Sequence, residues 1–349
     1  MTTPSKAGRL RIVQWATGTV GSAAMRAVLT HPDMELVGVK VYSPGKEGMD
    51  AGELCGMEPT GITAVRDRES ILALKPDCVL YMPEHTDYND VCALLENGIN
   101  ISSTRAEFFH PGSMDPAIRA RIEAACTKGG ATLHSSGSSP GFITEALPLV
   151  LLSLARRLDL LTIDEFANCI DGCSEEMLIN IMGFGETPQA FAQRPFYERD
   201  EVFNHSLRAL AQALGIVIDR FEVTSEVALA RRPVKLHKST IPAGSVAGQR
   251  MTTTGYCDDR PVMRFRCNWF VTEDLEPGWD LRSDGWRVMV EGDTPLDISI
   301  GFPIPQAERQ ATLPNLTAHR PVNAIPAICA ARPGILTTAE LPTILPRLD

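Results

Sequence analysis

Apolar and polar positions over residues 9–150 form short β-prone runs that are separated by stretches with helical periodicity. This alternation is typical of βαβ units around a parallel sheet, and it predicts a Rossmann-type domain. The predicted strands are residues 10–15, 35–41, 78–81, 99–103 and 132–135. The predicted crossover helices are residues 21–29, 67–74, 87–96 and 115–127, two of them ending at Asn97-Gly98 and Gly129-Gly130.

The second half of the chain has a different pattern. Residues 142–158 form a long apolar stretch, which predicts a connecting helix with Pro140 near its start and a kink at Pro148. Five β-prone runs follow without regular helical crossovers, which predicts a mainly antiparallel open sheet with helices on one face. These runs are residues 160–169, 221–229, 263–270, 286–290 and 297–302.

A last helical stretch, residues 320–332, precedes Pro333-Gly334 and is expected to return to the first domain. The predicted fold class is therefore α/β, with an N-terminal Rossmann domain and an α+β second domain that contains the open sheet. The expected boundaries place the first domain at 1–145, the second at 146–316, and the C-terminal helix and tail at 317–349.

Composition and charge narrow the class of protein. The 349 residues are 44% hydrophobic and 22% charged, which is ordinary globular composition and enough for two cores. The formal net charge of −10 argues against a nucleic-acid partner, which requires a basic surface. Residues 1–10 lack a signal-peptide core, and no window approaches about 20 uninterrupted apolar residues, so we expect a cytoplasmic protein without a membrane partner.

Nine cysteines are scattered along the chain. None forms a CxxC pair, and none has a histidine at metal-ligand spacing. Because free cysteine packs as a small apolar side chain, we expect reduced, mostly buried thiols and no metal site.

The segment Ala16-Thr17-Gly18-Thr19-Val20-Gly21 follows the first predicted strand and is a variant of GxGxxG with alanine in the first position. Gly18 would let the backbone approach a pyrophosphate, and Gly21 would let the helix pack closely on the sheet. The helix N-terminus would face the phosphates. The motif is weak alone, but its place between a first strand and a first helix favours dinucleotide binding over a plain glycine turn.

About 20 residues further on, an NAD-specific site usually presents a carboxylate to the adenosine ribose. Here the second strand leads into Val41-Tyr42-Ser43-Pro44-Gly45-Lys46, which contains no acidic residue. The Ser43 hydroxyl and the Lys46 ammonium suit a ribose phosphate, so NADP(H) is favoured as the cofactor. If Lys46 is only a solvated loop residue, NAD(H) would bind as well.

Two later strands end in Tyr81-Met82-Pro83 and in Ser102-Ser103-Thr104. Ligands of open α/β sheets bind at the carboxyl ends of strands. We therefore expect Met82, Pro83 and Thr104 to border the nicotinamide ribose. The alternative is that these residues merely cap their strands.

Four segments carry a resemblance that covers nearly the whole chain: Val13-Gln14-Trp15-Ala16-Thr17-Gly18-Thr19-Val20-Gly21, Val41-Tyr42-Ser43, Ser136-Gly137-Ser138-Ser139-Pro140-Gly141-Phe142 and Arg320-Pro321-Val322-Asn323-Ala324-Ile325-Pro326. In combination they are similar to the dihydrodipicolinate-reductase-like oxidoreductases, nearest the native amine dehydrogenases and the 2,4-diaminopentanoate dehydrogenases. Dihydrodipicolinate reductases proper carry a His-His pair followed by a lysine, which serve a dicarboxylate substrate. This sequence contains no His-His pair, which argues against that activity.

The resemblance implies a catalytic residue. In the amine dehydrogenases a glutamate after the fifth strand handles the substrate nitrogen, and Glu107 matches that position. A carboxylate base is useful there, because hydride leaves an amine carbon only when the nitrogen is neutral. The flanking Phe108 and Phe109 would help to exclude solvent. The alternative is a surface carboxylate that pairs with Arg105.

The substrate pocket is expected to come from the second domain, and its mostly apolar candidates suit a small aliphatic or cyclic ketone. Each candidate could equally be a core residue. Asn323, at the start of the predicted C-terminal helix, could donate to the nicotinamide amide or simply begin the helix. The pocket candidates are Phe142, Asn168, Cys169, Asp171, Met177, Met182 and Phe184.

The main hypothesis is therefore an NAD(P)H-dependent amine dehydrogenase acting on a ketone or amine and ammonia. A reductase of preformed cyclic imines or carbonyls has the same fold with a different pocket. A catalytically silent NADPH-binding sensor is a third interpretation. The flat antiparallel sheet also leads us to expect a homodimer.

Overall fold

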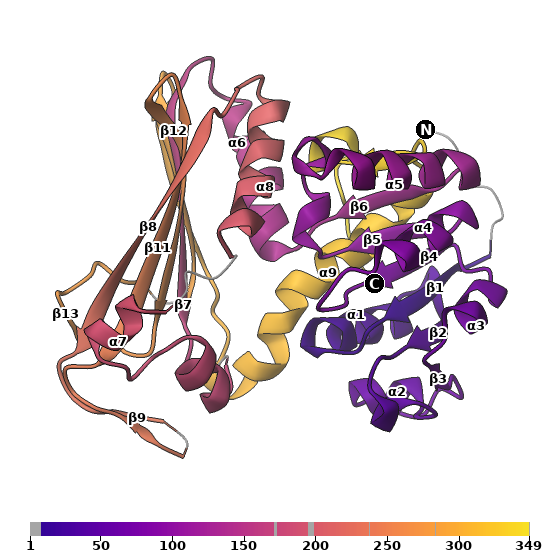
Figure 1. Cartoon of the computed structure of the whole chain (residues 1–349), viewed down its shortest axis with the longest axis horizontal. Helices are drawn as coiled ribbons and strands as arrows, with labels where there is room; N and C mark the ends of the chain where they lie inside the picture. Colours follow the sequence, from indigo (N-terminus) through magenta and orange to yellow (C-terminus); the bar gives the residue numbers. More distant parts are fainter. Residues whose placement is uncertain (1–7, 171–172, 195–198, 237, 283, 349) are drawn as a thin grey trace. The chain divides into compact units, whose positions relative to one another are not determined.

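The computed structural model describes residues 8–170, 173–194, 199–236, 238–282 and 284–348 (Figure 1). The chain divides into two compact units. The first unit combines Met1–Phe142 with Pro314–Asp349, and the second unit is Ile143–Leu313. The predicted fold class is confirmed, because a parallel Rossmann-like sheet is followed by a mixed, mostly antiparallel one.

The first unit is built on a seven-stranded sheet with the order β16-β6-β5-β4-β1-β2-β3, and every pairing in it is parallel. Parallel neighbours place all carboxyl ends at one edge of the sheet, which is where ligands of such sheets bind. The strands are β1 Leu10–Trp15, β2 Met34–Lys40, β3 Ala64–Val65, β4 Cys78–Tyr81, β5 Asn100–Ser103, β6 Thr132–Ser135 and β16 Gly334–Leu336.

Aspartate side chains begin four of the helices that follow these strands. The carboxylates of Asp50, Asp67, Asp87 and Asp115 each accept hydrogen bonds from backbone N–H groups of the first turn. The first helix, α1, has no such cap, so its N-terminal N–H groups are left for a ligand. The helices are α1 Thr19–Leu29, α2 Ala51–Cys55, α3 Arg68–Ala73, α4 Tyr88–Glu96, α5 Pro116–Gly129 and α9 Arg309–Cys329.

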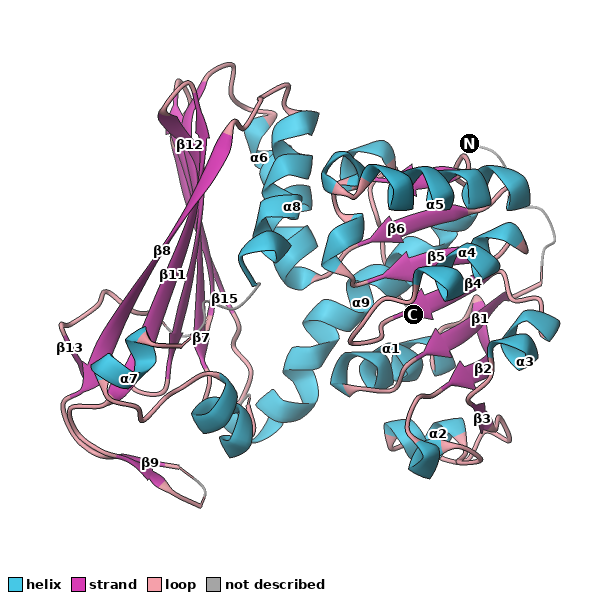
Figure 2. Ribbon diagram, viewed as in Figure 1, coloured by secondary structure: helices cyan, strands magenta, loops and turns pink. Residues whose placement is uncertain are grey.

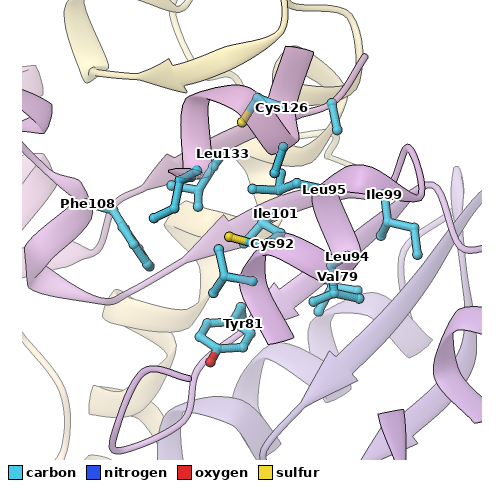
Figure 3. Close-up of a cluster of buried hydrophobic side chains, with 14 of the residues drawn as sticks. Val79, Tyr81, Cys92, Leu94, Leu95, Ile99, Ile101, Phe108, Cys126 and Leu133 are labelled. Carbon is cyan, nitrogen blue, oxygen red and sulfur yellow. The ribbon is translucent and has the colours of Figure 1, made fainter. Parts of the chain in front are cut away.

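Side chains that alternate along the strands fill two cores, one on each face of this sheet. Val13 and Trp15 pack toward α4 and α5 in the cluster that Figure 3 shows. Ile12, directly before Val13, packs on the opposite face with residues of α1. Val322 and Ile325 of α9 join this second cluster, so the C-terminal helix is part of the first unit's core.

The second unit is built on another seven-stranded sheet, with the order β13-β8-β11-β12-β7-β14-β15. The pair β12 and β7 is parallel and the other pairings are antiparallel. Helix α8 lies along one face of this sheet (Figure 2). There Phe203 stacks on Phe265 of β12, with ring centroids 4.1 Å apart. The strands are β7 Leu158–Asn168, β8 Arg220–Ala230, β11 Val246–Cys257, β12 Arg260–Phe270, β13 Leu275–Glu276, β14 Gly285–Gly292 and β15 Leu296–Gly301.

The remaining elements of this unit are short, apart from α8. The strands β9 Val234–Lys235 and β10 Thr240–Ile241 form a separate antiparallel pair. The helices are α6 Leu147–Leu152, α7 Pro188–Ala192 and α8 Arg199–Ala213.

Two helix predictions had wrong bounds. The expected connecting helix at 142–158 is helical only from Phe142 to Leu152, where α6 ends, and β7 already begins at Leu158. Its apolar positions did not distinguish a helix from the start of a buried strand. The C-terminal helix begins at Arg309 rather than near residue 320, because its packing on the sheet outweighs the local cost of Pro314 and Pro321.

Candidate functional site

The carboxyl ends of β1, β2, β4 and β5 border a cavity of about 450 Å³ in the first unit. It contains most of the residues that the sequence predicts for cofactor binding, and these residues come from four separate parts of the chain. Its lining residues are Ala16, Thr17, Gly18, Thr19, Val20, Gly21, Tyr42, Ser43, Lys46, Met82, Pro83, Glu84 and Thr104.

The glycine-rich loop has the geometry that a pyrophosphate requires. Gly18 is the N-cap of α1, and a Cβ built on it would meet nothing within 4 Å, so a ligand can approach the backbone there. A Cβ on Gly21 would lie 2.2 Å from the Ala16 carbonyl oxygen, which shows how closely helix and loop pack. Ala16 has a φ of 75°, the left-handed conformation that glycine adopts more easily. The loop and the uncapped helix end therefore fit a dinucleotide.

The predicted adenosine end follows β2. Ser43 and Lys46 both line the cavity, and Lys46 lies at the end of a short helical turn, Pro44–Lys46. The Lys46 Nζ donates to the Thr17 carbonyl oxygen at 2.9 Å and to Thr17 Oγ1 at 3.2 Å. Glu84 also lines the cavity, but it follows β4 rather than β2. A phosphate bound near Lys46 would replace these neutral oxygen atoms as the hydrogen-bond acceptor of the ammonium.

Glu107 lies just beyond β5, in the short helical turn Ala106–Phe108, and its side chain is 21% exposed. Its Oε1 accepts hydrogen bonds from the Thr86 hydroxyl and from Arg105 Nε, the latter at 3.2 Å. Arg105 also donates to Thr86 Oγ1 at 3.0 Å and to the Glu84 carbonyl oxygen at 2.5 Å. No described residue donates to Glu107 Oε2, so one oxygen of a firmly held carboxylate is left for another partner.

Three other expected residues lie elsewhere. Phe108 and Phe109 are 0% and 2% exposed, and Phe108 packs in the core cluster of Figure 3 rather than over Glu107. Asn323 is in the interior of α9, not at its start as expected, because that helix begins at Arg309. It is not among the residues that line the nucleotide cavity.

Three of the predicted substrate-pocket residues are core residues of the second unit. Cys169, Met182 and Phe184 are at most 6% exposed and pack in one apolar cluster. Asn168 ends β7, where its Oδ1 accepts from the Ile170 N–H at 3.2 Å. Met177 is 37% exposed, in a π-helical turn, Met177–Ile181.

The other two pocket candidates are Phe142 and Asp171, and only Phe142 is among the described residues. Phe142 belongs to the first unit, with the Arg320 guanidinium 5.9 Å from its ring centroid. Asp171 lies outside the described residues. Phe142 is not among the residues that line the nucleotide cavity.

Sequence reasoning assigned no role to Tyr42, although it lines the cavity and is 47% exposed. Its hydroxyl accepts a hydrogen bond from Trp15 Nε1 at 3.0 Å. Lys40, the last residue of β2, lies directly under the Tyr42 ring and was also missed. The sequence did contain a signal for these two residues: a lysine ends an apolar strand and stands close to an aromatic residue at the predicted adenosine end.

Comparison with known proteins agrees with this geometry. A family model for the 2,4-diaminopentanoate dehydrogenase C-terminal domain matches residues 181–347, and one for the dihydrodipicolinate reductase N-terminus matches residues 12–101. An amine dehydrogenase of Streptomyces virginiae is 27% identical, with 95% of each chain covered. A 2,4-diaminopentanoate dehydrogenase of Acetoanaerobium sticklandii is 21% identical, with 96% of this chain and 94% of that one covered.

Among solved structures, the amine dehydrogenase from Mycobacterium smegmatis superposes with a TM-score of 0.76 over 97% of each chain, at 23% identity, which shows a shared fold. Within the described part of the chain, no helix is long and apolar enough to cross a membrane. The relatives make the chain an oxidoreductase of the amine-dehydrogenase type, and they imply a nicotinamide cofactor.

Proposed function

We propose that this chain, which belongs to the dihydrodipicolinate-reductase-like oxidoreductases, is an NAD(P)H-dependent amine dehydrogenase. Its reaction is the reversible reductive amination of a small aliphatic or cyclic ketone or aldehyde with ammonia, which gives a primary amine. The observation that carries the proposal is the Glu107 carboxylate, held beyond β5 with Oε2 left without a described donor. The similarity to an amine dehydrogenase over almost the full chain supports it.

A bound nicotinamide would supply hydride transfer to or from the substrate carbon. The substrate nitrogen must be neutral before that carbon can release hydride, so an ammonium substrate needs a base beside it. Glu107 Oε2 takes this proton. In the direction of amination the same carboxylate takes a proton from ammonium, so that neutral ammonia can attack the carbonyl carbon, and gives this proton to the oxygen that becomes the carbinolamine hydroxyl. It then takes a second proton from the attached nitrogen and passes it to that hydroxyl, which leaves as water.

Thr86 and Arg105 position this base. Both donate to Glu107 Oε1, and Arg105 is itself held by the Glu84 carbonyl oxygen. A carboxylate fixed in one rotamer loses less entropy when a substrate binds, and it stays aligned with the nitrogen. The ion pair with Arg105, which the sequence offered as an alternative to catalysis, is therefore compatible with it, because it leaves Oε2 for the substrate.

We further propose NADP(H) as the preferred cofactor, with NAD(H) accepted more weakly. Lys46 and Ser43 line the cavity at the end of β2, where an NAD-specific site carries an acid. A 2′-phosphate near Lys46 Nζ would replace its bonds to the neutral Thr17 oxygen atoms with an ion pair between two charged groups. Met82, Pro83 and Thr104 are proposed to border the nicotinamide ribose.

A homodimer through the open sheet of the second unit also belongs to the proposal. On β12, Arg264 and Arg266 alternate with Phe265, which packs under α8, so the arginines occupy the opposite face. Arg266 forms an ion pair with Asp164 on that face, which neutralises charge that would otherwise repel a second copy. Sedimentation that shows only monomer at micromolar concentration would reject this arrangement.

The function is tested by following NADPH oxidation with a panel of small ketones and aldehydes, with and without ammonia. We expect oxidation that requires both the carbonyl compound and ammonia, and NADP⁺ reduction with the corresponding primary amine. Oxidation without ammonia would instead indicate a reductase of carbonyls or preformed imines. Tight cofactor binding with no turnover across the panel would indicate a sensor.

A further inference from the structure

Tyr42 presents a large aromatic ring to the nucleotide cavity. It follows β2 directly, lines the cavity and is 47% exposed, in contrast to the other aromatic side chains at this edge, Trp15 and Tyr81, which are 0% exposed. The hydrogen bond from Trp15 Nε1 to the Tyr42 hydroxyl fixes the position of the ring. An ordered, half-exposed aromatic ring inside a cavity is suited to a flat ligand.

A buried cation lies behind this ring. The Lys40 Nζ is 3.1 Å from the Tyr42 ring centroid and 5.0 Å from the Trp15 ring centroid, and Lys40 is 5% exposed. Burial lowers the pKa of Lys40, and the charges of Asp90 and Asp87 oppose this shift. Because the ammonium covers one face of Tyr42, the other face is the one left for a ligand.

We infer that Tyr42 is the platform on which the adenine ring of the dinucleotide stacks, and that Lys40 is the positioning residue that holds this platform from behind. The inference rests on nicotinamide-dinucleotide binding in this cavity, and it does not depend on amine chemistry at Glu107.

The place of Tyr42 in the sheet selects adenine over nicotinamide. In this fold the residues that follow the second strand contact the adenosine ribose, whereas the pyrophosphate lies at the N-terminus of the first helix. Tyr42 directly precedes Ser43, the proposed ribose-phosphate ligand. A ring next to that ribose is within reach of its base. Lys40 is shielded by the ring, so Lys46 rather than Lys40 is the cation for the 2′-phosphate.

The effect of the platform is measured as dissociation constants by titration calorimetry. The probes are NADPH, adenosine 2′,5′-bisphosphate, which carries the adenine, and nicotinamide mononucleotide, which does not. Loss of a stacked base typically weakens binding by roughly 5- to 100-fold. We expect Tyr42→Leu to weaken NADPH and the bisphosphate by this factor and to leave the mononucleotide unchanged. Tyr42→Phe, which keeps the ring and loses the bond to Trp15, should stay within about threefold of the parent.

Lys40 is tested with Lys40→Met, which keeps the aliphatic stem, and with Lys40→Arg, which keeps the charge. The methionine variant should weaken the bisphosphate several-fold, with arginine restoring most of the affinity, whereas a merely structural role would weaken the mononucleotide equally. Tyr256→Leu is the matched control, because that tyrosine also lies against a cation, with Arg220 3.8 Å from its ring centroid, but belongs to the second unit.

Two results would overturn the inference. One is a Tyr42→Leu protein that binds the bisphosphate as tightly as the parent does. The other is an equal loss of affinity for all three probes, which would mean that the whole cavity had been disturbed. Both results are measured as binding, without ketone or amine turnover. A failure of the proposed reaction can therefore be distinguished from a failure of this inference.

Discussion

His134 in β6 gives the fold a pH-dependent stability that can be calculated. Its ring is fully buried, and its Nδ1 donates to the Leu336 carbonyl oxygen in β16 at 2.8 Å. The carbonyl can only accept, so Nδ1 carries the proton and Nε2 is the site of further protonation. Nε2 has no hydrogen-bond partner among the described residues. Burial therefore lowers the pKa of His134 from 6.5 to about 4, although the bond to Leu336 opposes this.

The sign follows from proton counting. Between pH 4 and 6.5 the unfolded chain holds a proton on His134 that the folded chain lacks, so stability is lost as the pH falls through this window. The full difference corresponds to about 3 kcal/mol. With these two pKa values, lowering the pH from about 7 to about 5 reduces the free energy of unfolding by roughly 2 kcal/mol.

The assay is urea unfolding at a series of pH values for the parent and for His134→Gln. The glutamine amide can still donate to Leu336, so the variant should fold with lower stability at neutral pH and lose about 2 kcal/mol less on acidification than the parent. His85→Gln, at an exposed position, is the control and should keep the parent's slope. Parallel curves for the parent and His134→Gln would refute the buried neutral histidine.

Three further predictions concern the nucleotide cavity. Lys46→Ala should weaken NADPH binding by about 1–3 kcal/mol and spare NADH, measured by calorimetry; equal losses would contradict the phosphate assignment. Gly18→Val should abolish binding of both dinucleotides while the protein stays folded, because its side chain fills space that is open in the structure; retained affinity would disprove the loop assignment. Ala16→Gly should stabilise the chain by about 0.5–1 kcal/mol in urea unfolding, since glycine adopts a φ of 75° without strain; a destabilised variant would contradict this.

Much of the first unit could be predicted from the sequence because its signals are local. The strands β1, β4 and β6 begin and end at the predicted residues, since each is a short β-prone run with turn residues beside it. The short α2 and β3 were missed, because five and two residues carry too little periodicity. The phosphate loop was predicted because GxGxxG combines a sequence pattern with a required position.

The second unit shows where local signals fail. The strand β11 was not predicted, although it is an interior strand that pairs with β8 and β12. Its sequence contains three consecutive threonines, residues 252–254, and the glycines Gly248 and Gly255, and therefore has no alternating apolar pattern. Its stability comes from pairing with residues that are distant in sequence.

For the candidate site, the sequence placed residues at strand ends but could not give side-chain directions. For this reason the prediction placed Phe108 over Glu107, whereas its side chain lies in the core. The position of the Lys40 ammonium under the Tyr42 ring was not predicted, for the same reason.

The most direct test of the account is the ammonia-dependent turnover of Glu107→Gln. The substitution keeps size and hydrogen bonding but removes the base, so turnover should fall by about 10²–10⁴-fold while cofactor affinity stays nearly unchanged. Glu123→Gln is the control, because it removes a carboxylate from another arginine ion pair, with Arg119 at 2.8 Å on α5, and should keep parental turnover. Near-normal turnover of Glu107→Gln, with the parent's pH profile, would contradict the mechanism.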